Sequence, residues 1–258
     1  MFEQDRVIMR LQQRILGEKD ILVCFLAGSY GRRVDDAYSD LDVALIFAGE
    51  EQRALAWRNR VKFAGSLLPF ITCNSFDADH VRQFFHIALY SNGAKVDYRY
   101  ETQESLAPNP WDRDIRLLKD TNGWGERFQT ASVKTLMTQP TMSAEELEAL
   151  DKRFWVMFMD VYRQLLRGDH DKPFTVYLEL LHFSLPPLLR LLPPEDSARS
   201  ALLNASFGHD TRATVTHMAE LLDAYLTARS AIVKRLHLAF TSNISFENSI
   251  LNIVKRTS

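Results

Sequence analysis

The chain has 258 residues, of which 46% are hydrophobic and 25% are charged, and its formal net charge is −2 at pH 7. This composition is typical of a globular chain with room for one large or two modest domains. The balanced charge argues against a general nucleic-acid binder, which needs a basic face to offset phosphates. No apolar run approaches the length of about 18 residues that a membrane-spanning helix requires.

The beginning of the chain and the cysteines bear on where the protein resides. Residues 1–17 are charged and amphipathic, without the apolar stretch of a signal peptide. Cys24 and Cys73 lie in apolar, strand-like runs, which favours buried free thiols, and the sequence has no cysteine and histidine spacing typical of a zinc site. We therefore expect a cytoplasmic protein with no membrane partner.

The first predicted elements surround a turn that contains glycine and serine. Apolar residues at helical spacing predict a helix over 2–16, and an apolar run predicts a buried strand over 21–27. Gly28 and Ser29 follow as a turn that leads into one short helix. A second apolar strand is predicted over 41–47.

Two aspartates stand where this second strand begins. Asp40 and Asp42 are two positions apart, so on a strand their side chains point to the same face, about 6.5 Å apart along the backbone. Two carboxylates beside a Gly-Ser turn are suited to hold a divalent metal ion and a polyphosphate together. Asp35 and Asp36, which precede them, are interpreted as solvated loop acids.

The following elements complete a sheet. We predict a helix over 50–68, strands over 70–75 and 84–90, a brief helical turn capped by Asp77 or Asp79, a hairpin turn at 91–93, and an edge strand over 115–119. The hairpin leads into a strand with Val96, Tyr98 and Tyr100 on one face and Lys95, Asp97 and Arg99 on the other. The fold class predicted for 1–130 is α+β, with a mixed sheet flanked by helices.

The second half of the chain is predicted to be a helical bundle over 131–258. A capping-box pattern at 143–146 opens a long helix that ends before Gly168. Further helices are predicted over 173–192, with a kink or break at Pro186 and Pro187, and over 197–206, 210–238 and 246–255. Phe154, Phe158 and Tyr162 recur every fourth residue, which favours core packing, whereas Trp111 and Trp124 are predicted to lie in loops.

Gly28 and Ser29, followed by Asp40 and Asp42 with the first Asp eleven positions after the Ser, carry a resemblance to a known family. This pattern resembles the signature of the DNA-polymerase-beta-type nucleotidyltransferase superfamily. The layout, with a helical half after the sheet, is most similar to the lincosamide and aminoglycoside antibiotic nucleotidyltransferases. The motif covers roughly a tenth of the chain, and the C-terminal half carries no specific motif.

The resemblance implies a metal site made of three carboxylates. In the family a third acid comes from a later strand, and Asp97 is the candidate here. Asp40, Asp42 and Asp97 would then hold two Mg²⁺ ions, which clamp the attacking and leaving oxygens of an in-line displacement. By the same resemblance, Asp97 would accept the proton of the acceptor hydroxyl.

The resemblance also implies a nucleotide site. Gly28 would let the backbone approach the phosphates, and Ser29 would donate a hydrogen bond to them at the start of a helix. Arg32 or Arg33 is expected to reach the same phosphates. The co-substrate would be ATP or another nucleoside triphosphate, and no Walker-type motif supports a P-loop fold instead.

Three functions remain open from the sequence. The first is transfer of a nucleoside monophosphate, with AMP from ATP as the leading case, to a hydroxyl of a small molecule such as a lincosamide or aminoglycoside antibiotic. The second is the same chemistry on a protein hydroxyl or an RNA end, although no basic track favours nucleic acid. The third is a non-catalytic, nucleotide-binding regulatory module. A homodimer is compatible with the first, since relatives often build the cleft from two subunits.

Overall fold

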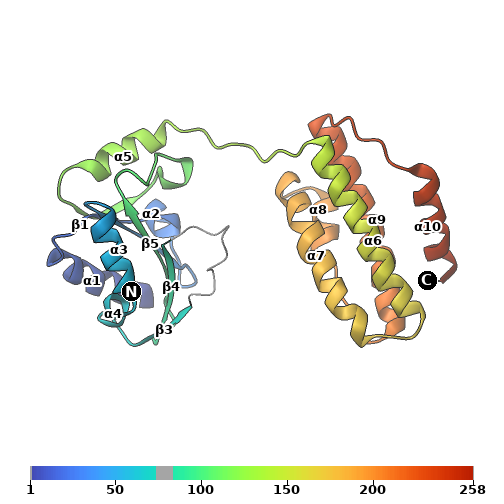
Figure 1. Ribbon diagram of the computed structural model, residues 1–258, viewed down its shortest axis with the longest axis horizontal. Helices are drawn as coiled ribbons and strands as arrows, with labels where there is room; N and C mark the ends of the chain where they lie inside the picture. Colours follow the sequence, from blue (N-terminus) through green and yellow to red (C-terminus); the bar gives the residue numbers. More distant parts are fainter. Residues whose placement is uncertain (1, 74–83, 258) are drawn as a thin grey trace. The chain divides into compact units, whose positions relative to one another are not determined.

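The computed structural model describes residues 2–73 and 84–257. The chain divides into two compact units, Met1–Met137 and Thr138–Ser258, which we call the sheet unit and the helical unit. The helical turn predicted at Asp77 or Asp79 lies outside the described residues, and the side chain of Cys73 is not described either. Figure 1 shows the helices and strands of both units.

The sheet unit alternates helices and strands from its first residues. Its elements are α1 (Glu3–Leu16), β1 (Ile21–Leu26), α2 (Gly28–Arg32), β2 (Leu41–Phe47), α3 (Glu50–Arg58), α4 (Arg60–Gly65), β3 (Phe70–Cys73), β4 (Phe85–Tyr90), β5 (Lys95–Thr102), the 3₁₀ turn η1 (Pro110–Asp112), β6 (Arg116–Asp120) and α5 (Trp124–Val133).

The six strands form one mixed sheet in the order β3-β4-β5-β2-β1-β6. Among the strand pairs that the structure describes, β2 and β5 run parallel and the others run antiparallel. The parallel pair lies at the centre, and in it Asp42 stands directly beside Asp97. The predicted α+β fold class is therefore confirmed, and β6 lies at an edge as predicted for 115–119.

Alternation along the strands divides the core between the two faces of the sheet. Leu41, Val43 and Leu45 of β2 pack with apolar side chains of α1, while Ala44 and Ile46 pack on the opposite face with Phe128 of α5 and its neighbours. Both sets are almost fully buried. The even-numbered side chains of β2, which include Asp42, therefore belong to the α5 face.

Three predicted elements differ from the structure. The helix predicted over 50–68 is broken at Asn59, which ends α3 and precedes α4. Trp124, predicted to lie in a loop, begins α5 and stacks on Phe128 with ring centroids 4.8 Å apart. Helix α7 runs continuously through Pro186 and Pro187, so the alternative of a break at these prolines is wrong.

The helical unit contains α6 (Ala144–Leu166), α7 (Asp171–Leu191), α8 (Ser197–Leu203), α9 (Thr211–Leu236) and α10 (Ile244–Thr257). Ser143 and Glu146 form the predicted capping box, because the Glu146 N–H donates to Ser143 Oγ at 3.1 Å and the Ser143 N–H donates to Glu146 Oε2 at 2.7 Å. Phe154, Phe158 and Tyr162 are fully buried, so the predicted core packing of this stripe is confirmed.

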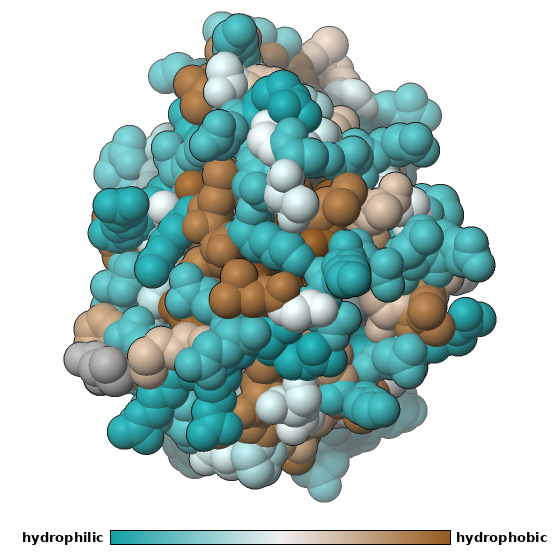
Figure 2. All heavy atoms as spheres, turned by 90° about the vertical axis from the view of Figure 1, so that its left-hand side faces the viewer, coloured by the Kyte–Doolittle hydropathy of each residue, from teal (hydrophilic) through white to brown (hydrophobic). Residues whose placement is uncertain are grey.

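The surface combines hydrophilic and apolar side chains, as the mixed composition suggests. Figure 2 shows one face on which hydrophilic side chains predominate around a central group of apolar ones. Within 2–73 and 84–257, no helix combines the length and apolar character needed to cross a bilayer. Cys24 is a buried free thiol, as predicted.

Candidate active site

The three predicted acids lie on adjacent segments of the central sheet. Asp42 of β2 and Asp97 of β5 are register partners in the parallel ladder, and neighbouring strands are about 4.8 Å apart. Their side chains therefore project side by side from the α5 face. Asp40 precedes β2 by one residue, and its side chain is 47% exposed, against 15% for Asp97.

The alternation of β2 and β5 explains this placement. Leu41 and Val43 on either side of Asp42, and Val96 and Tyr98 on either side of Asp97, have their side chains fully buried on the other face. Because side chains alternate along a strand, these four anchors direct both carboxylates to the α5 face. A shift in register by one residue would turn both acids toward the opposite, α1 face of the sheet.

Lys95 connects two of the acids through its ammonium group. Its Nζ lies 3.0 Å from Asp40 Oδ2 and 2.6 Å from Asp97 Oδ1. The pKa of Lys95 is raised, because the contacts with Asp97 and Asp40 outweigh its partial burial, which by itself would lower the pKa. The sequence places Lys95 on the same face as Asp97, but it gives no sign of the contact with Asp40.

Asp42 is the acid whose charge is least well accommodated. Its pKa is raised by burial first, and then by the neighbouring charges of Asp40 and Asp97, while Arg99 and Lys95 lower it. A carboxylate in this situation gains from an additional cation.

Gly28 allows the backbone to approach Asp42 closely. Its φ is +60°, a left-handed conformation that favours glycine, and a Cβ added to it would lie 2.1 Å from Asp42 Oδ2. The backbone here is also tied to β2, since the Ala27 N–H donates to the Asp42 carbonyl oxygen at 2.9 Å. No residue with a side chain fits at position 28 without displacing the carboxylate.

A cavity of about 600 Å³ opens beside these residues. It brings together five of the predicted site residues, which line it along with Lys95 and its neighbours: Gly28, Ser29, Arg32, Asp40 and Asp42. Arg33 does not line this cavity; it is exposed, with a left-handed φ of 58°, where it ends α2. Asp97 does not line the cavity either, but it contacts Lys95, which does.

The donor set fits a hard divalent cation in its chemistry. Mg²⁺ prefers carboxylate oxygens, and three carboxylates share this face. In the part of the chain that the structure describes, however, no group of three or more His, Cys, Asp and Glu side chains is placed to hold a metal ion. The Lys95 ammonium contacts both Asp40 and Asp97.

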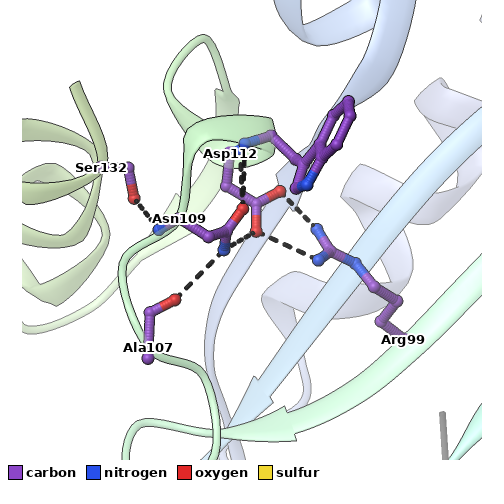
Figure 3. A network of polar contacts seen from close by, with 6 residues as sticks. Arg99, Ala107, Asn109, Asp112 and Ser132 are labelled. Carbon is purple, nitrogen blue, oxygen red and sulfur yellow. Dashed lines mark hydrogen bonds and ion pairs between the residues drawn. The ribbon is translucent and has the colours of Figure 1, made fainter. Parts of the chain in front are cut away.

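A buried ion pair stabilises the sheet next to the acids (Figure 3). Arg99, two residues after Asp97, donates from Nη1 and Nη2 to the carboxylate of Asp112 at 3.1 and 2.7 Å. Asn109 also donates to Asp112, and its own backbone N–H donates to Ser132 Oγ of α5. The pair anchors the segment that contains η1, and only the position of Arg99 on the Asp97 face was visible in the sequence.

Comparisons with known proteins add little to this geometry. No protein-family model matches the chain, and no curated protein matches it. A solved structure, an aminoglycoside 6-adenyltransferase from Bacillus subtilis, aligns over 98% of this chain and 97% of its own, with a TM-score of 0.38 and 10% sequence identity. A likeness at this level carries no argument about activity.

Proposed function

We propose that this chain is a metal-dependent nucleotidyltransferase that moves a nucleoside monophosphate onto a hydroxyl of a small molecule. The observation that carries the proposal is the register pair of Asp42 and Asp97, with Asp40 nearby, at the edge of a cavity lined by Gly28 and Ser29. ATP is the leading donor, and AMP is the group that it transfers. A lincosamide or aminoglycoside antibiotic as the acceptor is supported by the sequence resemblance alone.

The reaction is a displacement at the α-phosphorus of the nucleoside triphosphate. The acceptor oxygen forms a bond to this phosphorus, and the bond from the phosphorus to the bridging oxygen of the pyrophosphate breaks. Asp97 takes the proton of the acceptor hydroxyl, since its position on β5 sets it beside the metal ligands. Pyrophosphate leaves with the two electrons of the broken bond.

The other residues of the site have binding roles in this proposal. Asp40, Asp42 and Asp97 would hold Mg²⁺, which when bound neutralises the phosphates and aligns the attacking and leaving oxygens. The Ser29 hydroxyl and the Arg32 guanidinium line the same cavity and would donate to phosphate oxygens. Gly28 keeps the approach to Asp42 open.

The test is a pyrophosphate-release screen with ATP, GTP, CTP and UTP against a panel of hydroxyl compounds that includes both antibiotic classes. With the pair that the wild type uses, Asp42→Asn should lower turnover by about 10³-fold or more, because a metal ligand is lost. Asp20→Asn, an exposed acid next to the far end of β1, is the matched control and should retain turnover.

Two results would contradict the proposal. Asp42→Asn releasing pyrophosphate at the wild-type rate would remove the metal assignment. Nucleotide binding that does not depend on Mg²⁺, measured by isothermal titration and accompanied by no release with any acceptor, would favour the non-catalytic regulatory module instead.

A further inference from the structure

The ammonium of Lys95 occupies a position between acids that the proposed function assigns to metal. It contacts Asp97, two residues away on β5, and Asp40, which is 55 residues away in the sequence. The side chain of Lys95 is 41% exposed and lines the same cavity as Ser29 and Arg32. It therefore has room to move without disturbing the core.

We propose that Lys95 is the resident counter-ion of this site and that it transfers from the acids to the nucleotide phosphates when Mg²⁺ binds. This inference rests on the proposed function. It makes metal and nucleotide bind as a pair, because each removes an obstacle to the other. Metal takes the carboxylates that Lys95 releases, and the phosphates take the ammonium.

The distances explain why lysine and metal exclude each other. Mg²⁺ requires oxygen ligands at about 2.0–2.1 Å, in nearly octahedral geometry. Asp97 Oδ1 is a buried oxygen that has no hydrogen-bond partner among the described residues, and the Lys95 ammonium lies 2.6 Å from it. A metal ion bound to this oxygen would take the place of the ammonium, so Lys95 has to move away.

Charge explains where the ammonium goes. Once a divalent ion has replaced Lys95, a second cation close to it is repelled, whereas a triphosphate in the cavity attracts it. Arg99 cannot take this role, since both of its terminal nitrogens are hydrogen-bonded to Asp112. Lysine suits the transfer, because its ammonium is a compact charge on a flexible stem with three rotatable donors.

The exchange depends on the residue at position 95 being lysine. An arginine at position 95 would keep the charge but bind a carboxylate through a planar, bidentate fork, which is harder to exchange. Lys95→Arg is therefore expected to hold the acids more firmly than lysine does. Lys95→Met removes the cation while keeping most of the stem.

The experiment measures binding and needs no turnover. Mn²⁺ is titrated without nucleotide and followed by electron paramagnetic resonance, and ATP is then titrated at saturating Mn²⁺. Lys95→Met should bind Mn²⁺ alone about 10-fold more tightly than the wild type and should bind ATP about 10-fold more weakly, a size typical of changes around metal ligands. Lys95→Arg should bind Mn²⁺ alone more weakly than the wild type.

Control variants distinguish cation exchange by Lys95 from a purely structural role of this side chain. Lys62→Met changes an exposed lysine of α4 and should leave both affinities unchanged. Equal Mn²⁺ affinity in Lys95→Met and the wild type would overturn the inference, and so would weaker Mn²⁺ binding, which would mean that Lys95 only holds the acids in place. Circular dichroism of each variant verifies that it is folded.

The proposed function can fail separately. If Asp42→Asn keeps its pyrophosphate release while Lys95→Met binds Mn²⁺ more tightly and ATP more weakly than the wild type, the assignment of Asp42 as a metal ligand is wrong but the counter-ion exchange stands. If Asp42→Asn is inactive and Lys95→Met binds Mn²⁺ as the wild type does, the reaction stands and the exchange is wrong.

Discussion

Each unit of this chain contains a cation that bridges two carboxylates, but the two clusters differ in burial. In the helical unit Arg229 contacts Asp151 at 2.7 Å and Glu247 at 2.8 Å, and the three side chains are 7, 11 and 12% exposed. In the sheet unit the side chains of Lys95 and Asp40 are 41 and 47% exposed. The first cluster is largely buried, although Asp151 and Glu247 also line a cavity of about 1060 Å³. The second is half exposed beside a cavity of about 600 Å³.

The two cations also differ in the number of nitrogens that make their contacts. Arg229 donates from two nitrogens to Glu247 and also to Asp151, which accepts a further hydrogen bond from the Tyr225 hydroxyl at 3.0 Å. Lys95 makes its two contacts with one nitrogen. A largely buried cluster with several hydrogen bonds connects three helices, whereas a more open one has little effect on stability and can exchange its cation.

The largest expected effect comes from breaking the buried cluster of Arg229, Asp151 and Glu247. Arg229→Met should lower the free energy of unfolding by about 3–5 kcal/mol, because Asp151 and Glu247 are left as buried carboxylates without a cation. Urea unfolding followed by circular dichroism measures the loss. Lys152→Met, which breaks an exposed pair with Glu148, should stay within about 0.5 kcal/mol of the wild type. A similar small loss for both variants would remove the distinction between the clusters.

The next effect tests the geometry of the open site. Gly28→Ala should destabilise the chain by about 1–3 kcal/mol, since its left-handed φ is strained for alanine. It should also lower turnover by roughly 100-fold, because the new Cβ displaces the Asp42 carboxylate. Gly168→Ala is the matched control: its φ is +82°, with nothing within 4 Å of an added Cβ. It should show the strain without the loss of turnover.

A smaller effect is expected from the open cluster itself. Lys95→Met should change the free energy of unfolding by no more than about 1 kcal/mol, since a partly exposed pair is screened by solvent. The same urea titration measures it. A loss as large as that of Arg229→Met would mean that Lys95 is part of the structural frame.

The smallest effect has the opposite sign. The raised pKa of Asp42 means that its charged form is disfavoured in the folded state, so folding loses stability as the pH rises through this pKa. Asp42→Asn should therefore be slightly more stable than the wild type at pH 7, and the gain should disappear at acid pH, where Asp42 is protonated in both states. Urea unfolding at the two pH values decides this, and a destabilised variant at pH 7 would contradict the assignment.

The parts that the sequence predicted well are those set by apolar runs and by alternation. Continuous apolar runs predict β1 and β2, apolar residues at every second position predict β5, and parity along the strands places Asp42 and Asp97 on faces that can meet. That they do meet depends on the parallel register of β2 and β5, which is set by packing over a long separation in sequence. The resemblance supplied this expectation, and periodicity alone did not.

The parts that were missed depend on local or long-range contacts without a periodic signal. Gly123 and Gly125 around Trp124 suggested a loop, but Gly123 takes a left-handed φ as the N-cap of α5, and Gly125 lies close against Leu117 and Val23. The contacts of Lys95 with Asp40 and of Arg99 with Asp112 join separate segments. No regular spacing in the sequence predicts such pairs.

The central position of the parallel pair has a consequence for how the sheet opens. Strands at the rim, β3 and β6, are free to fray by local fluctuations, while β2 and β5 each keep a neighbour on both sides. The backbone that carries Asp42 and Asp97 should thus be among the slowest in this unit to exchange its amide hydrogens. Partial opening of the rim would leave the distance between these two acids intact.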